Sequence, residues 1–100
     1  MANNSFSEKI KSNTPTLVDF YADWCGPCKT MKPILAEVKS MVGDKASIIK
    51  IDVDKNQQVA SIYQIKSIPT LILFKNSKPI WRQTGIVSAK MIEQVIKQNL

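Results

Sequence analysis

A segment that is apolar on both faces, followed at once by an amphipathic helix, constrains the fold more than any other feature of this chain. Residues 16–22, Thr-Leu-Val-Asp-Phe-Tyr-Ala, contain a single charged side chain, Asp19. A strand of this kind lies in the middle of a sheet that helices cover on both faces. From Cys25 to Val42 apolar residues recur at helical spacing, and Pro33 should bend that helix. The chain is therefore predicted to have an α/β fold.

The other segments also alternate between helix and strand. Ser5 and Glu8 form the pattern of a capping box, which predicts a short helix with Phe6 and Ile10 facing inward and an end at residues 13–15. The first two strands should be parallel, as in a βαβ unit, and the last two should form an antiparallel hairpin. Further strands are predicted at 46–53, 70–75 and 79–84, and further helices at 56–63, capped by Asn56, and after Ser88.

Three methionines fall on the apolar stripes of the predicted helices. Met31 and Met41 lie in the helix that follows Cys25, and Met91 lies in the last helix with Ile92, Val95 and Ile96. Helical spacing of this kind is typical of side chains that pack in a core. All three are therefore predicted to be core residues rather than part of a redox or metal site.

Length and charge restrict the class of protein. The 100 residues fit one small domain, residues 1–100. The formal net charge is +6, but the lysines are scattered from Lys9 to Lys97 and the chain has a single arginine, Arg82. Proteins that bind nucleic acid usually gather Lys and Arg on one face. The charge therefore does not favour a nucleic-acid partner.

The segments expected of exported or membrane proteins are not found. The N-terminal residues, Met-Ala-Asn-Asn-Ser, are polar and do not resemble a signal peptide. The apolar run 68–74 is far too short to cross a bilayer. The protein is thus expected to be cytoplasmic and not bound to a membrane. In that reducing compartment a pair of cysteines is more often catalytic or metal-binding than structural.

The two cysteines stand where the buried strand turns into the helix, in the sequence Trp24-Cys25-Gly26-Pro27-Cys28. The attacking species in disulfide exchange is the thiolate. A helix N-terminus favours such an anion through its unpaired N–H groups and its dipole. Proline loses no hydrogen bond this early in a helix, and glycine lets a partner chain approach closely. The motif therefore predicts redox chemistry.

A zinc site is the main alternative for the cysteines. Structural zinc needs four ligands, and the chain has no histidine and no third cysteine. Zinc shared between two copies of the chain remains possible on the sequence alone. The missing histidine also excludes a Cys–His dyad and a Ser–His–Asp triad.

Two segments resemble the thioredoxin family. The first is 17–29, Leu-Val-Asp-Phe-Tyr-Ala-Asp-Trp-Cys-Gly-Pro-Cys-Lys, and the second is 65–75, Ile-Lys-Ser-Ile-Pro-Thr-Leu-Ile-Leu-Phe-Lys. The likeness runs from about Phe6 to the C-terminus. It implies a three-layer domain with a mixed sheet. Because only residues 1–4 precede the first predicted helix, the family's first strand should be short or absent, which leaves four strands.

The resemblance also assigns roles, position by position. Cys25 is implied to be the exposed nucleophile, Cys28 the buried resolving thiol, and Asp19 the buried proton acceptor behind Cys28. Lys50 is implied to be the basic partner of Asp19, and Pro69 is expected to follow a cis peptide bond. A buried carboxyl has a raised pKa, which suits proton transfer near neutral pH. An apolar docking face for the substrate is implied at Trp24, Gly26, Pro27, Tyr63, Ile68, Pro69, Gly85 and Ile86.

The function that the resemblance implies is reduction of protein disulfides, with a thioredoxin reductase restoring the dithiol. The chain itself is expected to need no cofactor or metal and to act as a monomer. Two alternatives stay open, a binding module in a larger complex and a reductant dedicated to one partner.

Three residues and the charge depart from common family features. Ser77 follows Asn76 where a glycine is frequent, which disfavours a type I′ turn. Gln64 and Ser67 also stand where glycine is common. Many relatives are acidic, whereas this chain is basic, so acidic target proteins are expected.

Overall fold

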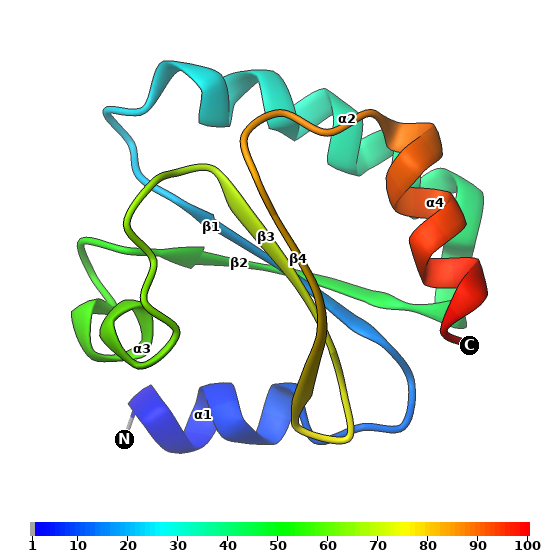
Figure 1. Cartoon of the computed structure of the whole chain (residues 1–100), viewed down its shortest axis with the longest axis horizontal. Helices are drawn as coiled ribbons and strands as arrows, with labels where there is room; N and C mark the ends of the chain where they lie inside the picture. Colours follow the sequence, from blue (N-terminus) through cyan, green and yellow to red (C-terminus); the bar gives the residue numbers. More distant parts are fainter. Residues whose placement is uncertain (1) are drawn as a thin grey trace.

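The computed structural model describes the backbone from Ala2 to Leu100 and the side chains from Ser5 onward. Helices and strands alternate until the final hairpin and helix (Figure 1). The elements in chain order are α1 (Ala2–Lys9), β1 (Thr16–Tyr21), α2 (Gly26–Val42), a short 3₁₀ turn (Gly43–Lys45), β2 (Ser47–Asp52), α3 (Gln57–Ile62), β3 (Thr70–Lys75), β4 (Lys78–Thr84) and α4 (Ala89–Gln98).

The sheet has four strands in the order β2-β1-β3-β4. β1 pairs in parallel with β2, while β1–β3 and β3–β4 are antiparallel. This arrangement confirms the predicted mixed, four-stranded sheet, and the described residues before β1 form a helix rather than a strand. As a result β1 lies inside the sheet and the Cys25–Cys28 segment leaves from its end.

Each face of the sheet is covered by a pair of helices, which explains why β1 is apolar on both faces. α2 and α4 lie on one side of the sheet and α1 and α3 on the other (Figure 1). Leu17 packs in the core beneath α2 and α4, whereas its neighbours Val18 and Phe20 pack with Phe6 on the opposite face. Successive strand residues point to opposite faces, so Asp19 shares the α2 face with Leu17.

The first helix begins earlier than predicted. Ser5 lies inside α1 instead of capping it, and the helix ends at Lys9, before residues 13–15. The capping box is therefore a wrong prediction. Phe6 and Ile10 are nearly fully buried, as expected. Packing of these two side chains, rather than the local cap, positions so short a helix.

Two other local predictions need correction. Asn56 precedes α3, but its side chain donates to the Asp52 carbonyl at 3.0 Å and makes no capping bond. Met31 is buried as predicted, whereas Met41 and Met91 are exposed. In α4 the buried stripe is Ala89, Ile92, Val95 and Ile96, and Met91 stands about 100° away from Ile92 around the helix.

The turn between β3 and β4 also differs from the prediction. Asn76 and Ser77 have φ angles of 53° and 68°, and positive φ at both central residues is the signature of a type I′ turn. The turn is attached to the loop after α1, because the N–H groups of Asn76 and Ser77 donate to the carbonyls of Ser12 and Ile10, each at 2.9 Å. These tertiary hydrogen bonds outweigh the preference of serine for negative φ.

Ser77→Gly is expected to stabilise the fold by about 1 kcal/mol, because a left-handed conformation costs a non-glycine residue roughly that much. The glycine keeps the N–H that bonds to Ile10. Ser67→Gly is the control, since Ser67 is exposed and does not have a positive φ. Urea unfolding should show a gain for the first variant alone. An equal effect of both would contradict the account of the turn.

Candidate active site at the start of α2

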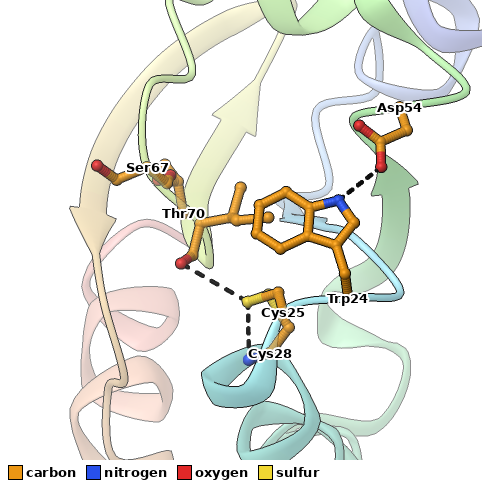
Figure 2. The surroundings of a disulfide bond; sticks show 7 residues. Trp24, Cys25, Cys28, Asp54, Ser67 and Thr70 are labelled. Carbon is orange, nitrogen blue, oxygen red and sulfur yellow. Dashed lines mark hydrogen bonds between the residues drawn. A yellow bond between two sulfur atoms is a disulfide. The ribbon is translucent and has the colours of Figure 1, made fainter.

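The two cysteines form a disulfide at the N-terminus of α2 (Figure 2). Their Cα atoms are 5.3 Å apart, within the usual range for a disulfide. Cys25 is the N-cap residue of α2, and its Sγ accepts a hydrogen bond of 3.2 Å from the Cys28 N–H. Gly26 begins the helix and Pro27 occupies its first turn. A thiolate on Cys25 would thus have a backbone donor and the positive end of the helix dipole beside it.

Cys25 is less accessible than the resemblance implied. Both cysteines are about 4% exposed, and they pack with Ala22 and with the partly buried Tyr21, Val53 and Ile68. The expectation of an exposed nucleophile is therefore wrong for this disulfide form. The physical reason is that the Cys25 sulfur lies 3.7 Å from the Ile68 carbonyl oxygen, where it is shielded by the segment before β3.

That segment contains the cis peptide bond predicted before Pro69. The Pro69 carbonyl accepts a hydrogen bond of 2.8 Å from the Gly85 N–H. The segments that lead into β3 and out of β4 are therefore joined beside the disulfide. The Thr70 hydroxyl lies 2.5 Å from the Ser67 carbonyl, which it donates to, and 3.1 Å from the Thr84 hydroxyl.

Trp24, the residue before Cys25, is exposed but anchored by a hydrogen bond. Its side chain is 71% exposed, yet its indole Nε1 donates a hydrogen bond of 2.8 Å to Asp54 Oδ2 (Figure 2). Asp54 follows β2, and its own N–H donates to Asp52 Oδ1 at 2.9 Å. This contact could not be predicted from the sequence, because 30 residues separate Trp24 from Asp54 and no single motif contains both.

Asp19 lies behind Cys28, in agreement with the predicted burial. It is 1% exposed, and its Oδ1 has no hydrogen-bond partner among the described residues. Burial raises the pKa of Asp19 from 3.8 to about 6, although the positive charge of Lys50 opposes part of this rise. A cavity of about 170 Å³ adjoins the carboxyl and Cys28; its lining is Asp19, Tyr21, Ala22, Asp23, Cys28, Lys29, Lys32 and Lys50. This volume has room for water between the carboxyl and the thiol.

The structure brings Lys50 to this cavity but places Tyr63 elsewhere. Lys50 is the register partner of Asp19 on the neighbouring strand. The ring of Tyr63 packs 5.8 Å from that of Phe6 and 5.1 Å from that of Phe74, in the core between the sheet and α1. This aromatic packing removes Tyr63 from the docking face to which it was assigned. The remaining docking residues surround the disulfide or the Pro69–Gly85 contact.

Comparisons with known proteins agree with this geometry. The thioredoxin family model matches residues 1–98. A thioredoxin from Staphylococcus saprophyticus is 39% identical over 100 residues, which cover all of this chain and 95% of that protein. Thioredoxin Y of rice chloroplasts is 49% identical over 98 residues, 97% of this chain but 58% of the rice protein. The chain thus spans a little over half of the plant relative.

Solved structures show the same fold. A mutant thioredoxin from Halobacterium salinarum superposes with a TM-score of 0.87 at 32% identity, over 96% of this chain and 83% of the other. Mitochondrial thioredoxin 3 of Saccharomyces cerevisiae, in its oxidised form, gives 0.85 at 33% identity, over 96% and 89%. The family model, the relatives and the solved structures together show that the chain belongs to the thioredoxin family.

Proposed function

We propose that this protein is a dithiol–disulfide oxidoreductase that reduces disulfides of other proteins. The observation that carries the proposal is the Cys25–Cys28 disulfide at the start of α2, beside the Ile68 carbonyl. In the reduced protein the Cys25 thiolate attacks one sulfur of a target disulfide, and the other target sulfur leaves as a thiolate. Cys28 then attacks Cys25 in the mixed disulfide. The target leaves with both sulfurs reduced, because two electrons have passed to it from Cys25 and Cys28, which are left oxidised as a disulfide.

Asp19 and Lys50 serve the second attack in this proposal. Cys28 must lose a proton before it can attack, and Asp19 shares a cavity with it. A carboxyl with a pKa of about 6 can accept a proton near neutral pH. Lys50 holds part of that carboxyl population in the ionised, proton-accepting form.

The docking roles follow from the surroundings of the disulfide. The main chain of Ile68 can pair with an extended target segment, because its carbonyl already faces Cys25. Pro69 and Gly85 fix the two loops that such a segment would cross. Their exposed neighbours provide apolar contact surface, namely Trp24, Gly26, Pro27 and Ile86.

The proposal also includes the oligomeric state of the protein, its electron donor and its compartment. Residues 1–100 act as one domain and as a monomer, and a thioredoxin reductase returns electrons to the disulfide. No described helix is long and apolar enough to cross a membrane. The plant relatives are chloroplastic by name, whereas we place this protein in the cytoplasm. Cell fractionation would show which compartment contains the protein. Alkylation of free thiols in each fraction would show whether Cys25 and Cys28 are reduced there.

Reduction of insulin by dithiothreitol tests the activity. Catalysed precipitation of the insulin B chain, lost in Cys25→Ser, is the expected result. A binding module that only docks partners would leave the uncatalysed rate unchanged in both proteins.

Acidic targets should be reduced faster than neutral ones at low salt. The cavity beside the cysteines is lined by three lysines, Lys29, Lys32 and Lys50, against two aspartates, and Lys66 is exposed two residues before Ile68. Between 20 and 500 mM NaCl the rate with an acidic protein disulfide should fall by about tenfold, because salt screens long-range attraction. Hydroxyethyl disulfide, which is uncharged, is the control. Equal salt dependence of both substrates would contradict electrostatic steering.

A further inference from the structure

An uncharged pocket lies at the segment that connects β4 to α4. Its volume is about 270 Å³, and it is lined by Gln83, Ile86, Val87, Ser88 and Met91. The cavity behind Cys28, by comparison, has three lysines and two aspartates in its lining. The lining has no charge and combines the polar side chains of Gln83 and Ser88 with the apolar ones of Ile86, Val87 and Met91, so it suits an uncharged occupant that has apolar surface.

Two large apolar side chains at this pocket remain open to solvent. Ile86 is 54% exposed and Met91 is 50% exposed. Met91 stands beside the buried stripe of α4, and its N–H is held by the Ser88 hydroxyl at 3.2 Å, so its backbone is fixed. The side chain itself is unbranched and polarisable, which lets a methionine adapt to differently shaped apolar groups.

The pocket is continuous with the segments that face the disulfide. β3 and β4 pair as far as Thr70 and Thr84, and the hydrogen bond from Gly85 to Pro69 extends that pairing by one step. In Figure 1 the segment between β4 and α4 runs from this point to the start of α4. A target chain that lies along Ile68 and crosses Gly85 therefore reaches Ile86 and Met91 next.

We propose that this pocket is a substrate subsite for one large aliphatic or aromatic side chain of the target, close in sequence to its reactive cysteine, and that Met91 determines this preference. The proposal rests on the oxidoreductase function proposed above. Burial of such a side chain against Ile86 and Met91 removes apolar surface of both partners from water. An acidic side chain would gain nothing here, because the lining offers it no cation.

Peptide disulfides provide the test. The host peptide has one intramolecular disulfide and glutamine at the three positions on either side of one of its cysteines. In each of six further peptides, leucine replaces one of these glutamines. Reduced protein, freed of dithiothreitol, is mixed with each peptide, quenched with acid, and analysed by chromatography. The variants are Met91→Gln and, as a matched control, Met41→Gln, which changes an exposed methionine of α2. Thermal unfolding confirms that both are folded.

At least one leucine position should raise the rate of the parent protein by about fivefold, a modest value for a half-open apolar site. Met91→Gln should lower the ratio of the leucine rate to the all-glutamine rate to about one, and Met41→Gln should keep the ratio of the parent protein. Equal rates for all peptides, or a preference that survives Met91→Gln, would overturn the subsite while leaving the oxidoreductase function intact. A parent protein that reduces none of the peptides would refute that function instead. Analytical ultracentrifugation tests a further outcome. If the sedimentation coefficient of the parent protein rises with concentration and that of Met91→Gln does not, Met91 lies in an interface between two copies of the chain, which also overturns the subsite.

Discussion

Cys28→Ser is expected to stop turnover and to leave the protein joined to its targets through Cys25. The Cys25 sulfur would still have the Cys28 N–H as a donor, since serine keeps the backbone, so the first attack should proceed. The mixed disulfide should then persist, because serine is not a thiol and water does not replace one in disulfide exchange. With reductase as the sole electron donor, turnover should fall below about 1% of the parental rate.

Affinity purification from cells makes the measurement. Tagged Cys28→Ser should bring down a set of proteins that separate from it only on reducing gels. Cys25→Ser is the matched control, because it keeps the second cysteine but lacks the attacking thiol. Identical captured sets for the two variants would mean that binding is not covalent, which would favour a binding module over a catalyst.

Asp19→Asn is expected to stabilise the oxidised protein by about 1–3 kcal/mol at pH 8. Burial raises the pKa of Asp19 to about 6, from 3.8, so ionisation is harder in the folded protein than in the unfolded chain. Above pH 6 both states are ionised, and the folded state carries the full penalty. Well below pH 3.8 both are protonated and the penalty is absent. Stability of the parent protein should therefore fall as pH rises from about 4 to 6, and that of the variant should not.

Urea unfolding at pH 4 and pH 8 checks this difference. The gain from the substitution should be fully present at pH 8 and mostly lost at pH 4. Lys50→Met is a useful companion, because the charge of Lys50 lowers the pKa of Asp19. Its removal should shift the pH-dependent loss of stability to higher pH. A gain for Asp19→Asn of equal size at both pH values would mean that the carboxyl charge is not its cause.

The same substitution should slow release of the target more than capture. Capture needs only the Cys25 thiolate, whereas release needs Cys28 to lose a proton in the Asp19 cavity. The rate of release should fall by about ten- to a hundredfold at pH 7. This is no more than the smallest rate enhancement that a well-placed general base usually provides. Stopped-flow measurement of both steps with one peptide disulfide separates them. Equal slowing of the two would argue against Asp19 as the proton acceptor.

The sequence predicted the redox site well because its main parts are local. Cys25 and Cys28 lie within one helical turn, and the strand before them is apolar on both faces, so sequence spacing alone places the thiols at a helix start. Asp19 could be predicted to be buried for the same reason, as the one charge in that strand. The roles of Pro69 and Lys50 could be predicted only from the family resemblance, because both residues are distant in sequence from the cysteines.

Contacts between distant segments decided the rest. The limited exposure of Cys25 comes from Ile68, 43 residues away, and the Trp24–Asp54 hydrogen bond spans 30 residues. Ser77 adopts a conformation that its side chain disfavours because the turn bonds to Ile10 and Ser12. Apolar periodicity fixed which residues form helices and strands. It could not fix whether Tyr63 packs against the core or whether Met91 is exposed, since residues at the border of a stripe are buried or exposed according to what packs against them.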